Sequence, residues 1–267
     1  MIKTEELLLL AINASLKAGE EILKIYNSDF AVELKEDNSP LTLADKNAHE
    51  AICKELSSSN FPVLSEEGKM TGYAERSQWK YFWMVDPLDG TKEFVKHNGE
   101  FTVNIALIHQ QRSILGVIYI PVTNTLYFAA EGIGSYKLQI TDYRLQIVDL
   151  GKLITSSQKL PVQNLNKKFT VVASRSHLSE ETEQFIAGLK TVHKEINFIS
   201  SGSSIKLCLV AEGSAEVYPR FAPTMEWDTA AGQAICEMAG KQVRDYTTNA
   251  SLLYNKENLL NNWFIVQ

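Results

Sequence analysis

Two aspartates that lie three residues apart form the most suggestive chemical group in this sequence. Asp86 directly follows the apolar run 81–85, and Asp89 comes after a proline and Leu88. Gly90 permits a positive φ angle, so a sharp turn is expected where the run ends. Such a turn can direct both carboxylates and the Leu88 carbonyl to one point, and these are oxygen ligands that Mg²⁺ prefers. A strand–turn–helix segment needs no metal, so a purely structural turn is the alternative.

The backbone that follows Gly90 adds a place for an anion. The pattern after this residue predicts a helix, and the N–H groups of Gly90 and Thr91 would lie at its start. N–H groups at the start of a helix lack an intrahelical partner, and the helix dipole favours negative charge there. One short segment therefore predicts metal ligands beside a site for a phosphate group.

Three more acidic residues are candidates, each with an ordinary structural explanation. Asp45 is expected in the first turn of a helix that runs from about Thr42, a plausible N-cap, to Leu56, and an aspartate suits the helix dipole there. Glu66 lies in an acidic loop at the end of the short strand 63–64, and such loops are usually solvated. Asp228 is expected at the N-cap of a helix, although the small residues after it would let that helix end approach a site closely.

Residues 1–152 are predicted to form an α+β part that carries most of these acidic residues. Apolar residues recur every three or four positions over 4–26, which indicates a helix. Alternating or continuous apolar segments then indicate strands at 101–109, 113–122, 125–130 and 135–139. Helices followed by antiparallel strands are typical of an α+β layer. The polar segment 155–168 is interpreted as a linker.

Residues 153–267 are predicted to form an α/β part that carries Asp228. Strands at 169–173, 195–199 and 215–218 alternate with helices at 178–189, 203–211 and 229–239. Ligands of open α/β sheets bind beyond the carboxyl ends of the strands. The polar loops expected there contain candidates for binding an anion, namely Arg175, His177, Ser203, Lys206 and Arg220. Helix capping, solvation or surface ion pairs would explain each of them individually.

The composition limits the classes of function. The chain has 267 residues, a formal net charge of −6 and 45% hydrophobic residues, which are ordinary values for a globular protein. This charge argues against a surface that coats nucleic acid, but it allows a small nucleotide in a basic pocket. The three cysteines are far apart, and no apolar run approaches the length of a membrane span. We therefore expect a soluble cytoplasmic protein with reduced cysteines and no transmembrane segment.

Taken together, these motifs resemble the inositol monophosphatase superfamily of Mg²⁺-dependent, Li⁺-sensitive phosphatases. The shared motifs are VDPLDGT, a distant WDTAAG and an upstream SEE. Longer segments are similar to the CysQ-type 3′(2′),5′-bisphosphate nucleotidases and extend from about residue 38 to 232: NSPLTLAD, VLSEE, DPLDGTKEFVKHNGEFTVNIALI, SRSH, GSSIK and YPRF. Glu93 stands where inositol phosphatases usually have asparagine, which points to the nucleotidase branch. The resemblance implies a layered α-β-α-β-α sugar-phosphatase-like fold that contains the α+β and α/β parts.

The resemblance also implies a role for each candidate. Mg²⁺ would be held by carboxylates and one carbonyl, those of Glu66, Asp86, Leu88, Asp89 and Asp228. Asp45 would help to activate a water molecule through a further metal site, and Thr91 and Glu66 would also take part in catalysis. The amides of Gly90 and Thr91 would hold the scissile phosphate, beside the substrate-binding residues Glu66, Leu88, Asp89 and Asp228. The nucleoside and the other phosphate would contact His177, Ser203, Lys206 and Arg220.

The function implied is removal of the 3′-phosphate of adenosine 3′,5′-bisphosphate (PAP) to give AMP and phosphate in sulfur assimilation. The sulfate-donor nucleotide PAPS, converted to APS, is a second expected substrate. Two alternatives stay open, an inositol or sugar phosphatase and a nucleotide-binding regulator without turnover. The intact carboxylates argue against the regulator, because binding alone needs no group that activates water. The expected partner is a small nucleotide bisphosphate and not nucleic acid, while the oligomeric state and any peripheral association with the inner membrane are left open.

Overall fold

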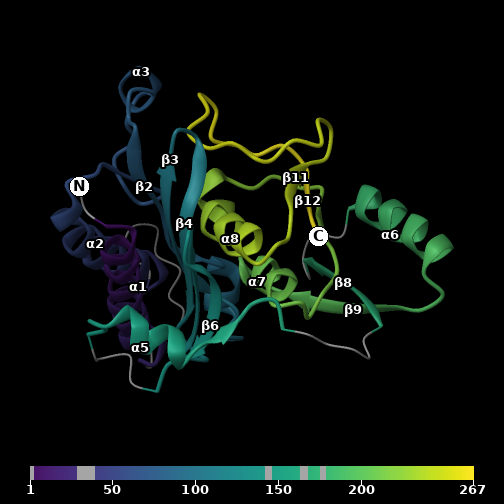
Figure 1. Cartoon of the computed structure of the whole chain (residues 1–267), viewed down its shortest axis with the longest axis horizontal. Coiled ribbons are helices and arrows are strands. Elements are labelled where there is room, and N and C mark those ends of the chain that lie inside the picture. The colour runs from purple at the N-terminus through teal and green to yellow at the C-terminus, as the bar shows by residue number, and fades with distance from the viewer. Residues whose placement is uncertain (1–2, 29–39, 142–145, 163–167, 175–178) are drawn as a thin grey trace.

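A seven-stranded sheet stands in the middle of the fold, with helices on both of its faces (Figure 1). The computed structural model describes residues 3–28, 40–141, 146–162, 168–174 and 179–267. In spatial order the strands are β1 (Val63–Ser65), β2 (Tyr81–Asp89), β3 (Thr102–His109), β4 (Arg112–Ile120), β5 (Thr125–Ala130), β6 (Gly134–Gln139) and β7 (Gln158–Lys159). β1 and β2 run parallel, and each later pair of neighbours is antiparallel. The predicted antiparallel strands of the first half are thus present.

One face of this sheet is covered by α1 (Thr4–Tyr26), α2 (Pro40–Leu56) and α5 (Leu150–Thr155) (Figure 1). One stripe of α1, which includes Leu8 and Ile12, is fully buried in the same hydrophobic core as Trp83 of β2. Gly19 lets α1 lie close to β4, because a Cβ atom at this position would come within 2.4 Å of the Tyr119 ring. The amphipathic pattern that predicted α1 therefore corresponds to its buried face.

α2 begins two residues before the predicted N-cap. Its first residue is Pro40, and proline suits the first turn of a helix because its fixed φ angle is already helical. The prediction that Thr42 caps this helix is therefore wrong. Asp45 is the sixth residue of α2 and lies beyond its first turn, so the helix dipole does not explain this aspartate.

The opposite face of the sheet packs against α7 (Ile205–Ala211) and α8 (Glu226–Met238). Gly116 of β4 lets α8 approach closely, because a Cβ atom there would lie 2.2 Å from the carbonyl oxygen of Ala231. The N-cap of α8 is Met225, so Asp228 is the third helical residue and not the predicted N-cap. The Asp228 carboxylate accepts a hydrogen bond from the Met225 N–H at 2.9 Å, as the acidic residue of a capping box does.

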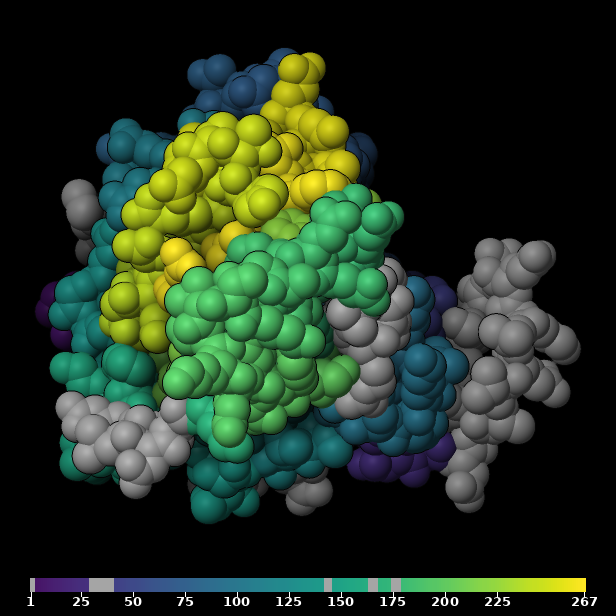
Figure 2. Space-filling model, turned by 90° about the vertical axis from the view of Figure 1, so that its right-hand side faces the viewer, coloured from purple at the N-terminus to yellow at the C-terminus, as the bar shows by residue number. Residues whose placement is uncertain are grey.

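Two smaller sheets and one helix form the outer layers. β8 (Phe169–Ser174) and β9 (Ile196–Ser201) are parallel neighbours, and α6 (Glu180–Val192) lies between them in sequence. The other small sheet has the order β10 (Tyr218–Arg220), β12 (Phe264–Val266), β11 (Val243–Asp245). Figure 2 shows this outer face, where α6 in green lies next to the yellow C-terminal segment. The layers of helix and sheet confirm the predicted fold class.

The pairing of β10 with β12 corrects one prediction. Arg220 was expected in a loop after a strand at 215–218, but it lies within β10, opposite Phe264. The partner strand comes from the C-terminal end of the chain, for which no strand was predicted, so local sequence did not reveal the register. The next helix begins at Ile205 rather than Ser203, which has a positive φ angle of 43°.

The connections contain three short helical segments, η1 (Ser57–Ser59), α3 (Tyr73–Arg76) and α4 (Thr91–Val95). β7 lies inside the segment interpreted as a linker and pairs with β6. One hydrophobic core contains Phe82 and Met84 of β2 together with Leu207 and Ile235 of α7 and α8. The division into residues 1–152 and 153–267 stays a prediction. None of the helices in the described ranges combines the length and the apolar character that a membrane crossing needs.

Candidate active site

A bulge in β2 turns Asp86 and Asp89 to the same face of the main sheet. Residues three apart in a regular strand point to opposite faces. The register with β3 shifts between the two aspartates, because Asp86 is opposite Asn104 whereas Asp89 is opposite Thr102. β2 thus has one residue more than β3 over this interval, as in a β-bulge. Leu88 is buried in the core on the α1 side, whereas Asp86 lies near Asp228 of α8 and Asp89 lines a cavity together with Asp228.

Three carboxylates from separate elements meet at this face. Glu66 directly follows β1, and its N–H donates to the Val85 carbonyl of β2 at 3.2 Å. Carboxylate oxygens of Glu66, Asp86 and Asp228 lie within 4.8 Å of one another. Such hard oxygen donors are the ligands that Mg²⁺ and similar divalent cations take in proteins. The structure therefore brings together three of the predicted metal ligands.

Burial and mutual repulsion raise the pKa of each carboxyl group in this cluster. For Glu66 and Asp86 burial is the larger cause, and the charge of Asp89 is the next. The same two causes raise the pKa of Asp228 to about 8. A cation bound among these groups would offset both effects, because it attracts the ionised form of each carboxylate.

Asp45 reaches the same cluster from α2. Its side chain is 8% exposed, and its Oδ1 has no hydrogen-bond partner among the described residues. Burial, followed by the charges of Glu67 and Glu66, raises the pKa of Asp45 to about 8. A buried carboxylate oxygen without a partner is unfavourable unless a cation or a bound water satisfies it. The residues present therefore fit a divalent metal ion.

Asp89 lies near enough to this cluster for its charge to raise the pKa values of Glu66, Asp86 and Asp228, and it is held from the other half of the chain. Its Oδ2 accepts a hydrogen bond from the Ser204 N–H at 2.6 Å and a longer one from Asn104 Nδ2 at 3.4 Å. Burial raises the pKa of Asp89, whereas the Lys206 charge and these two hydrogen bonds lower it. The loop before α7 thus contacts a carboxylate of the acidic cluster directly.

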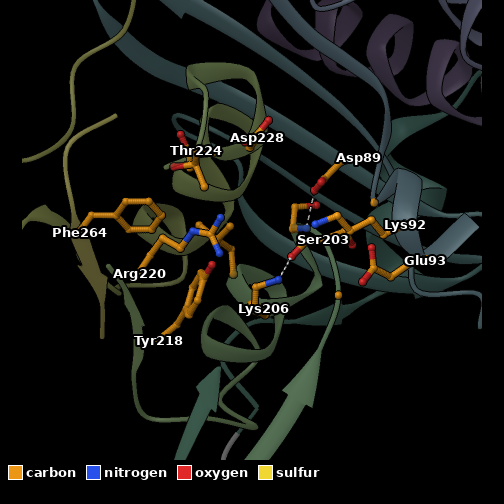
Figure 3. A pocket seen from close by; sticks show the side chains of 15 residues that line it. Asp89, Lys92, Glu93, Ser203, Lys206, Tyr218, Arg220, Thr224, Asp228 and Phe264 are labelled. Carbon is orange, nitrogen blue, oxygen red and sulfur yellow. Dashed lines mark hydrogen bonds between the residues drawn. The ribbon is translucent and has the colours of Figure 1, made fainter. Parts of the chain in front are cut away.

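A cavity of about 130 Å³ begins at Asp89 and Asp228 and extends between α4, α7 and β10. Figure 3 shows Lys92 and Glu93 on one side of it and Arg220 with Tyr218 on the opposite side. Three polar atoms of its lining residues lack a hydrogen-bond partner within the described part of the chain: Ser203 Oγ, Arg220 Nε and Thr224 Oγ1. Buried polar atoms are normally paired, so these atoms are suited to hold a polar ligand.

The two predicted phosphate-binding cations differ in their contacts. Lys206 is 5% exposed, and its Nζ donates to the carbonyl oxygens of Ser201 at 3.3 Å and Ser203 at 2.5 Å. Burial lowers the pKa of Lys206 to about 8. Arg220 donates through Nη2 to the Pro223 carbonyl at 2.8 Å, while its Nε has no partner in the described ranges. Lys206 therefore braces the loop, and Arg220 retains a donor for a ligand.

Gly90 and Thr91 lie at the start of a helix, as the pattern after β2 predicted. Gly90 is the N-cap of α4 with a φ angle of 98°, and Thr91 is the first helical residue. A Cβ atom at Gly90 would come within 3.1 Å of the Glu100 carbonyl oxygen, so glycine suits this position sterically as well. Arg175 and His177 lie outside the described residues, and their roles stay predictions.

The cavity also contains residues that sequence reasoning did not assign to the site. Lys92 directly follows Thr91 in the predicted phosphate cradle, and that position was the available signal. Tyr218, Thr224 and Phe264 line the cavity from β10, the segment after it and β12. No local pattern indicated these three, because the pairing of β10 with β12 decides where they lie.

The model of the inositol monophosphatase family matches residues 3–264. The chain belongs to the inositol monophosphatase family. This membership confirms the predicted enzyme class, a hydrolase of phosphoric monoesters.

Named relatives of this family resemble the chain over nearly its whole length. The 3′(2′),5′-bisphosphate nucleotidase CysQ of Shigella flexneri is 43% identical over 253 residues, which are 93% of this chain and 94% of that protein. CysQ of Escherichia coli K12 is 42% identical over 93% of this chain and 94% of that protein. The crystal structure of CysQ from Bacteroides thetaiotaomicron superposes with a TM-score of 0.95 at 55% identity, covering 99% of this chain and 97% of that one. An inositol monophosphatase from Zymomonas mobilis, at 19% identity and a TM-score of 0.76 over 100% of this chain and 94% of that one, shares the fold.

Proposed function

We propose that this chain is a Mg²⁺-dependent phosphatase that removes the 3′-phosphate of adenosine 3′,5′-bisphosphate and releases AMP and phosphate. The relatives at 42–43% identity carry the name 3′(2′),5′-bisphosphate nucleotidase, which supports this substrate over an inositol phosphate. PAPS, which carries the same 3′-phosphate, is the second proposed substrate. Both would place the enzyme in sulfur assimilation.

The observation that carries this proposal is the charge arrangement of the cavity. Asp89 and Asp228 join it to the acidic cluster, and Arg220 lies on its other side with an unpartnered Nε. A substrate with one phosphate would occupy the acidic cluster together with the cations bound there. A second phosphate would then meet Arg220, and charge-assisted hydrogen bonds of this kind are among the stronger ones in proteins. An inositol monophosphate would leave this donor unused.

Mg²⁺ is the proposed cofactor because the carboxylates that meet among the described residues offer hard oxygen donors. We assign it to the Glu66, Asp86 and Asp228 carboxylates, which lie together. Asp89 and the Leu88 carbonyl would join them, as the resemblance implies, and Asp45 would serve a further metal position. When bound, Mg²⁺ would lower the pKa of a water molecule and neutralise charge on the phosphate.

The side chains and backbone of the chain bind and orient the substrate. The N–H groups of Gly90 and Thr91 hold the scissile phosphate at the start of α4, and Asp45 with Thr91 orients the attacking water. Ser203 Oγ and Arg220 Nε bind the other phosphate. Lys206 acts mainly through the loop whose carbonyls it holds.

The test compares two substrates. We expect wild-type enzyme to have a higher kcat/KM for PAP than for inositol 1-phosphate. Arg220→Ala removes a charged hydrogen bond of roughly 1.5–3 kcal/mol, so its kcat/KM for PAP should fall about ten- to a hundredfold. Its kcat/KM for inositol 1-phosphate should change little. Lys206→Ala should also narrow the preference for PAP, because the loop that carries Ser203 loses its brace.

Three results would change the assignment. Wild-type preference for inositol 1-phosphate would favour the inositol phosphatase. Equal losses on both substrates in both variants would show that neither Arg220 nor the loop held by Lys206 contributes to the choice of substrate. Absence of phosphate release from every substrate in the presence of Mg²⁺ would support the regulator.

A further inference from the structure

A short series of buried polar side chains joins β3 to the loop before α7, beside Asp89. Thr102 and Asn104 are two residues apart on β3 and lie opposite Asp89 and Asp86 in the register with β2. Ser204 comes from the other half of the sequence. Thr102, Asn104 and Ser204 are 0%, 1% and 2% exposed, so none of them relies on solvent for hydrogen bonding.

The hydrogen bonds in this series have one consistent direction. Ser204 Oγ lies 2.7 Å from Asn104 Oδ1, and it must donate because an amide oxygen only accepts. Thr102 Oγ1 lies 2.7 Å from Ser204 Oγ, and since the Ser204 hydrogen is already used, Thr102 is the donor. The Asn104 amide is thereby oriented with its NH₂ group toward Asp89 Oδ2 at 3.4 Å.

The series ends on one oxygen of Asp89. Oδ2 accepts from Asn104 Nδ2 and from the Ser204 N–H, so both donors of the series converge on the same atom. Thr102 Oγ1 is 3.5 Å from this oxygen, but its hydrogen is committed to Ser204. Oδ1 receives no hydrogen bond from the described residues and is left for the acidic cluster and the cavity. The dashed line at Asp89 in Figure 3 marks the contact with the loop.

A second contact holds the same loop to the first half of the chain. Glu100 Oε2 accepts a hydrogen bond from the Gly202 N–H at 2.8 Å. Gly202 also packs tightly, because a Cβ atom there would lie 2.6 Å from Glu93 Cγ and 2.9 Å from the Glu100 carbonyl oxygen. The backbone N–H that reaches Asp89 is therefore fixed from both sides, by Gly202 and by the Ser204 side chain.

We propose that Thr102, Ser204 and Asn104 are positioning residues, which commit Asp89 Oδ2 to protein donors so that Oδ1 is presented to the metal. They contact Asp89 and one another, and they act through that carboxylate. The inference rests on the proposed function only in taking Asp89 as a metal ligand, and it does not depend on the identity of the substrate. Groups that orient a metal ligand in this way typically change metal affinity or activity 10–100-fold when they are removed, so about a tenfold loss is expected for one hydroxyl.

The experiment measures binding of Mg²⁺ alone, by calorimetric titration of the full-length protein without substrate. Thr102→Val deletes the first donor at nearly constant volume, and Ser204→Ala breaks the series in its middle while keeping the backbone N–H. We expect both variants to bind Mg²⁺ about tenfold more weakly than wild type. Thr102→Ser keeps the hydroxyl and should bind Mg²⁺ within about twofold of wild type. If the lost volume of the side chain were the cause, Thr102→Ser would instead weaken Mg²⁺ binding.

Thr170→Val is the matched control for stability. Thr170 is 2% exposed on β8, and its Oγ1 donates to the Lys168 carbonyl at 2.9 Å, away from the cavity. We expect it to lower Tm about as much as Thr102→Val does and to leave Mg²⁺ affinity unchanged.

Asp89→Asn distinguishes a failure of the positioning role from a failure of the metal assignment. If Asp89→Asn weakens Mg²⁺ binding and Thr102→Val and Ser204→Ala do not, the positioning role is wrong and the metal assignment stands. If Thr102→Ser is as impaired as Thr102→Val, the hydroxyl is not the cause and the inference is likewise overturned. If Asp89→Asn itself binds Mg²⁺ like wild type, the metal assignment fails together with the inference.

Discussion

Single residues of the site divide into those that reach a ligand and those that hold their neighbours. Arg220 and Ser203 have unpartnered polar atoms at the cavity, whereas Lys206 already donates to two carbonyl oxygens. A lysine in a polar loop after a predicted strand suits either role, and the two roles have different consequences for substrate choice. Asp89 combines both kinds of contact, because one oxygen is held by the protein and the other is available.

Asp89→Asn tests the metal assignment at this scale. The substitution keeps the shape of the side chain and removes one charged ligand, so Mg²⁺-dependent kcat/KM should fall about a hundredfold or more. The fold should persist, because removing a negative charge from a crowded carboxylate cluster relieves repulsion. Phosphate release and Tm are measured together. Near-wild-type turnover would show that this turn does not bind the metal.

Lys92 is the exposed cation of the cavity and can be tested against a neighbour. Lys92→Gln should lower kcat/KM for PAP about threefold to tenfold, because an exposed charge near a phosphate is partly screened. Lys96→Gln makes the same change at the end of α4, outside the residues that line the cavity, and should have less than about a twofold effect. If the two substitutions lower kcat/KM for PAP equally, the loss comes from the overall surface charge and not from the position of Lys92.

Two elements decide whether the acidic residues meet. The bulge in β2 places Asp86 and Asp89 on one face, and the close approach of α8 to β4 brings Asp228 to that face. Without the bulge, one of the two aspartates would point into the core beneath α1 and α2. Without close packing of α8, Asp228 would lie too far from Asp86 and Glu66 to share a cation with them.

Gly116→Ala should therefore weaken both stability and metal binding. The added Cβ atom would lie 2.2 Å from the Ala231 carbonyl oxygen, so α8 must move away from β4. We expect the free energy of unfolding to fall by about 1–3 kcal/mol, as overpacking of a core typically does, and Mg²⁺ affinity to fall with it. Denaturant unfolding and calorimetry provide the two measurements.

Gly188→Ala is the matched control. Gly188 lies in α6, and a Cβ atom there would have no neighbour within 4 Å. Alanine favours a helix over glycine by about 0.5–1 kcal/mol, so this variant should be slightly more stable than wild type. If both glycine substitutions have the same effect, close packing at Gly116 is not what positions α8.

At the scale of the whole molecule, burial and repulsion in the acidic cluster make the stability of the fold depend on pH. The pKa values of Asp45 and Asp228 are about 8 in the folded protein, against an ordinary value of 3.8. Between these values the folded state binds more protons than the unfolded chain. The free energy of unfolding therefore falls as pH rises from about 4 to about 8.

Thermal unfolding of the metal-free protein should show this decline. We expect Tm in EDTA to decrease from about pH 5 to about pH 8, and Mg²⁺ to raise Tm more at the higher pH, where the carboxylates are free to bind it. Asp45→Asn should reduce the slope of Tm against pH, because it removes one of the carboxyl groups whose pKa is raised. A metal-free Tm that rises steadily over this range would contradict the raised pKa values of these buried, mutually repelling carboxyl groups.

The sequence by itself determined the elements and the chemistry of the first half. The 3.6-residue pattern of α1 and the alternating strands β3 to β6 are local signals, and the structure confirms them. The turn around Gly90 was also predictable, because proline and glycine constrain the backbone of their own segment. The combination of DPLDGT with WDTAAG identified the family, because a metal site requires particular residue types at fixed spacings.

The tertiary structure alone decided how these pieces combine. Asp228 is the third residue of α8 rather than its N-cap, and Arg220 lies within β10 because a C-terminal strand pairs with it. Lys206 braces a loop, and Asp89 is oriented by Ser204 from a distant part of the chain. Each of these outcomes depends on contacts between segments that are far apart in sequence. Local periodicity and turn preferences contain no information about such contacts, because they reflect the conformation of one segment and not the position of its neighbours.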